Sequence, residues 1–270
     1  MAAYELALTV LGSGTSVGVP TVGCDCKVCR STDERDKRLR PSVLVSYRGR
    51  NILIDTTPDF RSQALRATID RVDAVLFTHA HADHIMGLDD LRPFNFRQRD
   101  PIPIYASPPH LDYIKRVFPY IFDDRPTESS KPKISASEFE FGCAGIDLFG
   151  LTFVPLRLAH GKGVSFGYRF GPVAYLTDHS DIPPESLERL EGLDILFLDA
   201  LRHNPHPTHS TVNQSLKWVD QLKPRQAYFT HISHDLGHEQ TEKQLPAHVR
   251  LAYDTMRVTA MVYEEAEGER

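Results

Sequence analysis

The chain has 270 residues, of which 41% are hydrophobic and 25% are charged. This balance is typical of a folded globular protein and excludes a wholly disordered chain. The formal net charge of -5 disfavours a broad electrostatic contact with nucleic acid, so extended nucleic acid is not expected as a substrate. The sequence has neither a signal-type N-terminus nor a run long enough to span a bilayer, which predicts a cytoplasmic protein without membrane contact.

The first third of the chain predicts strands separated by turns and one short helix. Apolar and polar residues alternate from Tyr4 to Leu11, as in a half-buried strand. Residues 42–54 predict a hairpin that turns at residues 48–50. A short helix is expected from Phe60 to Asp70, and the apolar run that follows it predicts a strand ended by His79.

Strand-like and helix-like patterns interleave through the rest of the chain. Strands are expected within residues 101–107, 146–160, 164–180, 194–200 and 226–233, and helices near 109–118, 184–192, 211–222 and 239–252. This order predicts an α/β fold of the layered α+β kind, in a single domain over residues 1–270. The segment Asp123–Lys133 is the best candidate for a mobile surface loop.

Polar residues of the types that bind metals follow several of these apolar strands. They are His79, His160, Asp178, Asp199 and His231. Since α/β proteins usually place their chemistry where strand ends converge, these residues are candidates for one site.

The segment THAHADHIMGLDD concentrates metal-type side chains. His79, His81, Asp83 and His84 supply three imidazoles and a carboxylate within six residues, a set suited to zinc, manganese or iron. A turn after a strand can aim His79 and His81 at one ion and Asp83 and His84 at a second. The alternative, a His-rich surface loop that binds nothing, is disfavoured by this spacing.

With a later lone His, a later Asp and a last His, this motif resembles the metallo-β-lactamase superfamily. The resemblance implies an αββα sandwich of two mixed β-sheets flanked by helices. It also implies that His79, His81 and His160 hold a first metal ion, that Asp83, His84 and His231 hold a second, and that Asp178 bridges both.

The segment LGSGTSVGVPTVGCDCKVCRS is similar to the N-terminal segment of the phosphoribosyl cyclic phosphate phosphodiesterases, the PhnP family, and less closely to that of the PqqB family. A carboxylate at position 178 is similar to the branch that hydrolyses phosphodiesters and thioesters. The resemblance implies a phosphodiesterase that acts on a small cyclic phosphate or related phosphodiester. Two divalent ions, zinc or manganese with iron as a further option, would activate a bridging hydroxide that attacks phosphorus.

His209 is the candidate general acid, because histidine can donate a proton near neutral pH and its His-Ser-Thr segment resembles the acid-bearing segment of the superfamily's phosphodiesterases. A loop histidine without a role remains the alternative. Asp83 is expected to orient this acid or to shuttle its proton. Asp55 resembles the carboxylate that supports the histidine motif, and a purely structural hydrogen-bonding role is equally compatible. Four cations are weaker candidates for phosphate contact, with a solvated surface position favoured for each: Arg61, Arg157, Lys162 and Arg202.

Two other functions remain open. A nuclease that processes transfer-RNA 3′ ends shares the metal ligands, although the sequence contains no Gly/Lys-rich insertion of the kind such nucleases use to hold RNA. A PqqB-like accessory or carrier protein would bind metal without catalysis, but it has no need of a bridging Asp178 or of an acid such as His209. A homodimer is compatible with each function.

Three cysteines crowd into the loop at residues 22–31. In a reducing compartment such a cluster indicates a metal or redox site more often than disulfides. The PhnP resemblance implies a structural zinc held by Cys24, Cys26, Cys29 and His234. His238 is the rival fourth ligand, a redox pair or unpaired surface thiols are the alternatives, and Cys143 is expected to be a small buried apolar side chain.

Overall fold

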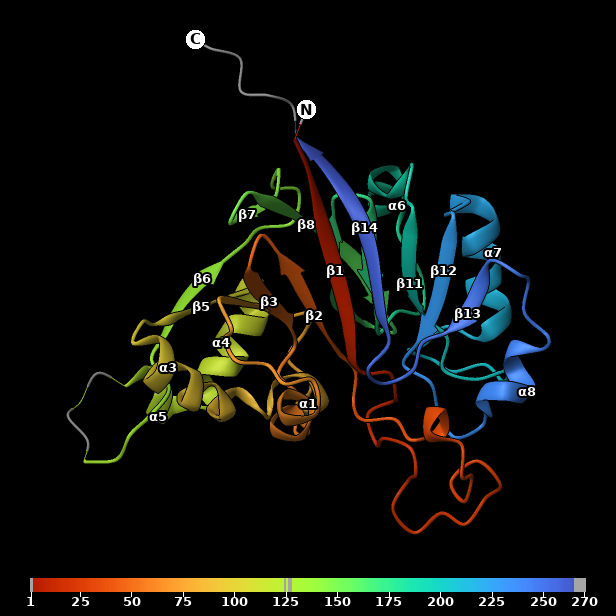
Figure 1. Cartoon of the computed structure of the whole chain (residues 1–270), viewed down its shortest axis with the longest axis horizontal. Helices are drawn as coiled ribbons and strands as arrows, with labels where there is room; N and C mark the ends of the chain where they lie inside the picture. Colours follow the sequence, from red (N-terminus) through yellow and green to blue (C-terminus); the bar gives the residue numbers. More distant parts are fainter. Residues whose placement is uncertain (1, 124, 126–127, 265–270) are drawn as a thin grey trace.

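A computed structural model describes residues 2–123, 125 and 128–264, which form two seven-stranded β-sheets packed face to face (Figure 1). The first sheet has the order β14-β1-β2-β3-β4-β5-β6, and the second has the order β13-β12-β11-β10-β9-β8-β7. Both sheets are mixed: neighbours from β3 to β6 and from β10 to β13 are parallel, and the others are antiparallel.

The first sheet takes its strands from the first half of the chain and from β14 near the C-terminal end, and the second sheet takes its strands from the second half. The first sheet comprises β1 (Ala2–Gly12), β2 (Ser42–Tyr47), β3 (Arg50–Ile54), β4 (Ala74–Leu76), β5 (Ile102–Ala106), β6 (Ile134–Glu138) and β14 (Arg257–Glu264). The second comprises β7 (Ile146–Leu148), β8 (Leu151–His160), β9 (Gly163–Phe170), β10 (Val173–Leu176), β11 (Ile195–Asp199), β12 (Gln226–Thr230) and β13 (Val249–Leu251). The helices are α1 (Phe60–Arg66), α2 (Ala82–Ile85), α3 (Arg92–Gln98), α4 (Pro108–Val117), α5 (Pro119–Phe122), α6 (Pro184–Leu187), α7 (Val212–Leu222) and α8 (His238–Glu242), with 3-10 turns at Glu34–Asp36, Leu88–Leu91 and Glu188–Leu190.

Three apolar clusters hold these layers together. The largest lies between the sheets and includes Leu6, Val45, Phe153, Tyr168 and Phe197. A second cluster lies between the first sheet and helices α1 and α4, and a third between the second sheet and α7. Helices cover the outer faces of both sheets (Figure 1), so the αββα sandwich is confirmed.

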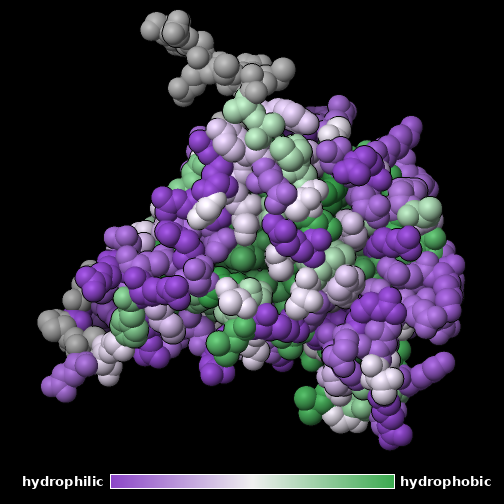
Figure 2. Space-filling view, viewed as in Figure 1, coloured by the Kyte–Doolittle hydropathy of each residue, from purple (hydrophilic) through white to green (hydrophobic). Residues whose placement is uncertain are grey.

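The surface of the same view is mainly hydrophilic, with hydrophobic side chains gathered near the middle of this face (Figure 2). None of the helices in the described part of the chain combines the length and the apolar character that a bilayer crossing needs.

Most predicted elements are present, but two predictions need correction. The helix expected near residues 239–252 ends at Glu242, and Val249–Leu251 is a strand that pairs in parallel with β12. Pro246 breaks the helix, and the free edge of β12 supplies the hydrogen bonds. The helix expected from Phe60 to Asp70 ends at Arg66. Part of the proposed loop at Asp123–Lys133, residues 124 and 126–127, lies outside the described residues, and the single domain remains a prediction.

Candidate metal centre and active site

The candidate site lies where strands of both sheets end on the same side of the sandwich. His79 follows β4, His160 ends β8, Asp178 follows β10 and His231 follows β12. Two hydrogen bonds join the sheets beside the site: the Phe166 amide donates to the Thr78 carbonyl at 2.9 Å, and the Tyr168 hydroxyl donates to the Phe77 carbonyl at 2.6 Å. The strand ends of the two sheets are thereby held in register around one centre.

The first group of donors consists of three imidazoles. One ring nitrogen each from His79, His81 and His160 lies within 4.8 Å of the others. His79 Nδ1 lies 3.0 Å from Thr78 Oγ1, and His160 Nδ1 lies 2.9 Å from the Thr208 carbonyl oxygen. These contacts through Nδ1 orient the rings of His79 and His160, as is usual for histidines that bind metals.

The second group adds carboxylates. Donor atoms of Asp83, His84, Asp178 and His231 also lie within 4.8 Å of one another. Asp55 supports His84 from the side away from the other donors. Its Oδ2 lies 2.7 Å from His84 Nδ1, and its carboxylate accepts hydrogen bonds from the Thr78 amide and hydroxyl at 2.8 Å each. Asp55 is therefore in the supporting position that the sequence suggested.

Three residues of the site have left-handed backbone conformations. The φ angles are +66° at Asp55, +54° at Asp178 and +58° at His231. Such angles are uncommon for residues other than glycine and cost free energy. Asp55 and His231 stand directly after a strand and Asp178 stands two residues after the end of β10, so the left-handed turns redirect the chain at the site.

The buried nitrogens of the second group have the environment of metal ligands. His84 Nε2 and both ring nitrogens of His231 are buried without a hydrogen-bond partner. The two carboxylate oxygens of Asp178 lie 3.3 Å from His84 Nε2 and 3.2 Å from His231 Nε2, pointing at the same space. Unpaired buried polar atoms cost free energy, so a divalent cation among them would satisfy the donor set.

Electrostatics within this group favour a bound cation. Burial alone would lower the pKa of His84, but Asp178, Asp83 and Asp55 raise that pKa well above its ordinary value. Burial likewise opposes ionisation of Asp178, yet His231 and His84 hold its pKa well below the usual range. A divalent cation would replace the protons that balance this buried carboxylate, which makes metal binding tighter as pH rises.

His209 lies beside both groups and is paired with a carboxylate. Its Nδ1 is 2.6 Å from Oδ2 of the fully buried Asp199, and its ring stacks on His231 with centroids 4.4 Å apart. Asp199 Oδ2 also accepts the His179 amide at 3.1 Å. Asp83, expected both as a metal ligand and as a residue that orients His209 or shuttles its proton, lies with Oδ2 3.2 Å from His84 Nε2. The pairing with Asp199 was missed, although the position of Asp199 at a strand end was a usable signal.

A cavity of about 470 Å³ opens in front of the first group. It is lined by His79, Ala80, His81, Ala82, Pro109, His110, Tyr113, His160, Gly163, Val164 and Thr208. The contribution of α4, above all His110 and Tyr113, was not predicted, because no local pattern reveals where this helix packs.

The four cations suggested as phosphate contacts are not among the residues that line this cavity. Arg157 lies 4.0 Å from Glu185, and Arg202 donates to the carbonyl oxygens of Asn204 and Pro205. The surface positions favoured for these side chains agree with this arrangement.

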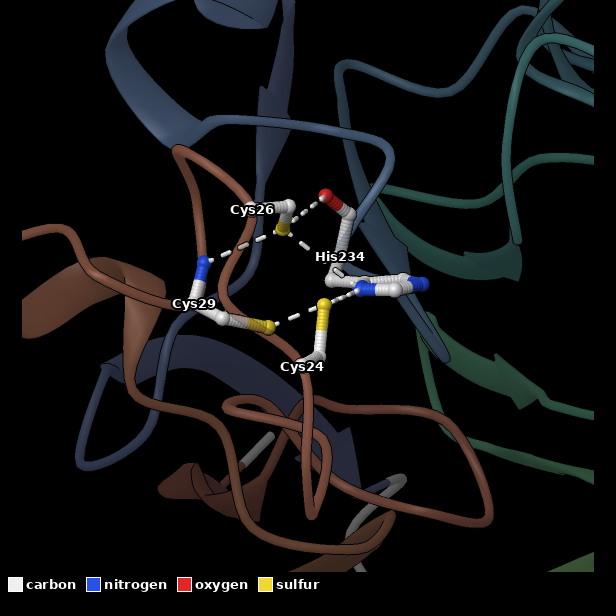
Figure 3. Close-up of side chains that lie close together, drawn as sticks. All are labelled: Cys24, Cys26, Cys29 and His234. Carbon is white, nitrogen blue, oxygen red and sulfur yellow. Dashed lines mark hydrogen bonds between the residues drawn. The ribbon is translucent and has the colours of Figure 1, made fainter.

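The N-terminal thiols meet one imidazole in the structure (Figure 3). The sulfur atoms of Cys24, Cys26 and Cys29 lie 3.2, 3.6 and 3.5 Å from His234 Nδ1. Ideal tetrahedral zinc, with Zn–S near 2.3 Å and Zn–N near 2.0 Å, separates sulfur from nitrogen by about 3.5 Å. The four side chains therefore fit a structural zinc.

The remaining candidates for this cluster lie elsewhere. His238 Nδ1 lies 3.0 Å from a guanidinium nitrogen of Arg38, so this ring is engaged away from the thiols. Cys143, expected to be a small buried apolar side chain, packs against the core between the sheets and is half-buried.

Comparison with known proteins identifies the family. Residues 50–232 match the model of the beta-lactamase superfamily domain. A crystal structure described as a new diphosphatase from the PhnP family is 51% identical, with a TM-score of 0.91 over 97% of this chain and 99% of that one.

Two curated relatives are longer proteins. An octanoyltransferase from Porphyromonas gingivalis is 41% identical over 91% of this chain and 50% of its own length. A ribonuclease Z from Bradyrhizobium diazoefficiens is 31% identical over 61% of this chain and 49% of its own length. The chain thus spans about half the length of the curated relatives it matches. Its fold, its histidine motif and its similarity along the whole PhnP-family structure agree: the chain belongs to the metallo-β-lactamase superfamily, among the PhnP-like proteins.

Proposed function

We propose that the protein is a metal-dependent phosphodiesterase that hydrolyses a small cyclic phosphate or a related phosphodiester. The observation that carries this proposal is the arrangement around Asp178. Its two oxygens approach His84 and His231, which have unpaired buried nitrogens, while the His209–Asp199 pair lies at the edge of the same centre. Similarity to a PhnP-family diphosphatase along the whole chain supports the choice of a phosphate substrate.

The two donor groups would hold two divalent ions, of zinc, manganese or iron. His79, His81 and His160 would hold one, Asp83, His84 and His231 the other, and Asp178 would contact both. When bound, such ions supply Lewis acidity and an activated water at neutral pH.

The residues of the chain would supply the proton for the leaving group. Asp199 accepts a hydrogen bond from His209 Nδ1, which orients the ring. His209 Nε2 has no hydrogen-bond partner among the described residues, so it is the atom from which a proton can pass to a departing alkoxide. In this proposal Asp83 serves as a metal ligand beside His84, and Asp199 takes the orienting role.

Removal of Asp178 provides the test. The protein, loaded with zinc, manganese or iron, is assayed on bis-p-nitrophenyl phosphate and adenosine 2′,3′-cyclic phosphate. Wild type should turn over both, and Asp178→Ala should lose at least about a thousandfold in kcat because it loses a ligand to both ions. Asp181→Asn is the matched control, since Asp181 is an exposed carboxylate three residues away. Lack of turnover by wild type with all three metals would contradict the proposal.

Two further substrates separate the rival functions suggested by the longer relatives. A precursor transfer RNA with a 3′ trailer tests the ribonuclease Z activity, and an octanoyl thioester tests the acyl chemistry named for the Porphyromonas gingivalis protein. We expect the cyclic phosphate to be cleaved with the highest kcat/KM. Metal binding without cleavage of any substrate would favour a PqqB-like accessory role.

A further inference from the structure

The cavity in front of the first donor group continues from the histidines to helix α4. Its wall on the α4 side is formed by Pro109, His110 and Tyr113. His110 and Tyr113 are three residues apart, which places both side chains on the same face of the helix. This wall lies outside both donor groups and outside the His209–Asp199 pair, so the reaction proposed above leaves it without a role.

In this wall His110 is held by two contacts, and Tyr113 presents an exposed aromatic ring. His110 Nε2 lies 3.2 Å from the Val164 carbonyl oxygen, and its ring meets the edge of Phe166 with centroids 6.2 Å apart. Tyr113 keeps 47% of its surface exposed, and the guanidinium of Arg116 lies over its ring at 5.6 Å from the centroid. An exposed aromatic ring at the mouth of a cavity is a surface on which a planar group can stack.

The cavity is poorly suited to a second phosphate. Its eleven lining residues include no Lys, Arg, Asp or Glu. Helix α4 begins with Pro108 and Pro109, so two of the amides that could bind an anion at its N-terminus are absent. The small side chains of Ala80 and Ala82 and the bare backbone of Gly163 leave room for a flat group.

We infer that the wall formed by Pro109, His110 and Tyr113 is a subsite for an uncharged planar ring of the substrate, a nucleobase, attached to the phosphodiester that the metal centre cleaves. This inference rests on the proposed phosphodiesterase activity and specifies its substrate class. The ring stacks on Tyr113, and the subsite gives no advantage to a substrate with an additional phosphate.

Three substrates with the same scissile ring test the inference. They are adenosine 2′,3′-cyclic phosphate, the methyl ribofuranoside 2,3-cyclic phosphate that lacks the base, and adenosine 2′,3′-cyclic phosphate that carries a 5′-phosphate. In wild type the base should raise kcat/KM about tenfold or more over the methyl riboside, since stacking of one base on an aromatic ring contributes on this scale. The 5′-phosphate should change kcat/KM by less than about threefold.

Matched variants assign the effect to Tyr113. Tyr113→Ala should remove most of the advantage of the base and leave kcat/KM for the methyl riboside within about threefold of wild type. Tyr113→Phe should keep the advantage. Tyr120→Ala is the control, because Tyr120 is equally exposed at 47% but lies outside the lining of the cavity.

The results that would contradict the subsite differ from the result that would contradict the proposed function. Equal kcat/KM for the base-bearing and base-free substrates in wild type would overturn the subsite, as would a Tyr113→Ala variant that loses the same factor on both. Two cations near the wall are to be tested: Arg116, which lies over the Tyr113 ring, and the exposed Lys162, in the turn between His160 and Gly163. A gain of more than tenfold from the 5′-phosphate that disappears in Lys162→Ala or in Arg116→Ala would show an anion subsite instead. Failure of all three substrates would contradict the proposed function itself.

Discussion

The His209–Asp199 pair offers the sharpest test of the proposed proton transfer. Asp199→Asn removes the charge that faces His209 Nδ1 at 2.6 Å and replaces an acceptor by an amide that can also donate. The imidazole then loses the hydrogen bond that orients it. In the comparable Ser-His-Asp arrangement, the same substitution lowers kcat by about 10⁴.

The size of the effect should depend on the leaving group. General acid catalysis typically contributes about 10²- to 10⁴-fold, or about 3–5 kcal/mol of barrier. We expect Asp199→Asn and His209→Ala each to lower kcat on adenosine 2′,3′-cyclic phosphate by this amount, because its leaving alkoxide needs a proton. The loss on bis-p-nitrophenyl phosphate should stay below about tenfold, because p-nitrophenolate departs without protonation.

The assay is steady-state kinetics over a series of aryl and alkyl diesters, with the slope of log kcat against the pKa of the leaving group as the readout. Both variants should have a steeper slope than wild type. Ser233→Ala is a control for a buried polar residue near the site that contacts neither member of the pair. The same fractional loss for every leaving group would refute the role of His209 as an acid and indicate a structural role for the pair.

Three further predictions concern metal binding and stability. Asp55→Asn should weaken the affinity of the second donor group for metal by about 10- to 100-fold, measured by competition with a chelator, because Asp55 supports His84. His234→Ala should remove the one zinc that resists mild chelation, measured by elemental analysis, whereas His238→Ala should retain it. Asp73 is buried, which would raise its pKa, but hydrogen bonds from Arg71, the Asn51 amide and Arg50 hold that pKa below the usual range. Asp73→Asn should therefore lower the free energy of urea unfolding by about 2 kcal/mol at pH 7.

The pH dependence of the last variant has a defined sign. A carboxylate with a depressed folded-state pKa stabilises the fold above its unfolded pKa of about 3.9 and loses that contribution as pH falls through the folded value. The difference between wild type and Asp73→Asn should therefore shrink below about pH 4. A difference that is constant or grows at low pH would refute the electrostatic account. For the metal variants, unchanged affinity in Asp55→Asn, or zinc retained by His234→Ala, would contradict the assigned contacts.

The sequence was most informative where the relevant residues are neighbours in the chain. One turn contains His79, His81, Asp83 and His84. Their spacing in the sequence therefore indicates how the side chains are arranged, and both donor groups could be predicted. The approach of His160, Asp178 and His231 followed from the tendency of strand ends to converge.

The pairs that were missed depend on tertiary packing. Asp199 and His209 meet because β11 ends beneath the loop that precedes α7, and neither residue has a local pattern that names the other. His110 faces the cavity because of where α4 packs against the sheet. The choice between His234 and His238 likewise depends on tertiary contacts, because the turn after β12 brings His234 to the thiols and Arg38 contacts His238.

Strand β13 shows that part of the fold, too, depends on tertiary packing and could not be predicted from local sequence. Residues 249–251 continue a pattern that resembles a helix, but the exposed edge of β12 and the interruption at Pro246 favour a parallel strand. Local propensity was overridden by a partner more than 20 positions earlier in the chain.

The most direct test of the central claim is the metal content of Asp178→Ala. Wild type, loaded with zinc and freed of excess metal, should hold two ions in the donor groups around Asp178 and one with the three thiols and His234, as measured by elemental analysis. The variant should lose the ions of the donor groups, keep the single zinc at the cysteines and retain a folded circular-dichroism spectrum. A folded variant with the full metal content of wild type would contradict the assignment of Asp178 as the residue shared by two metal ions.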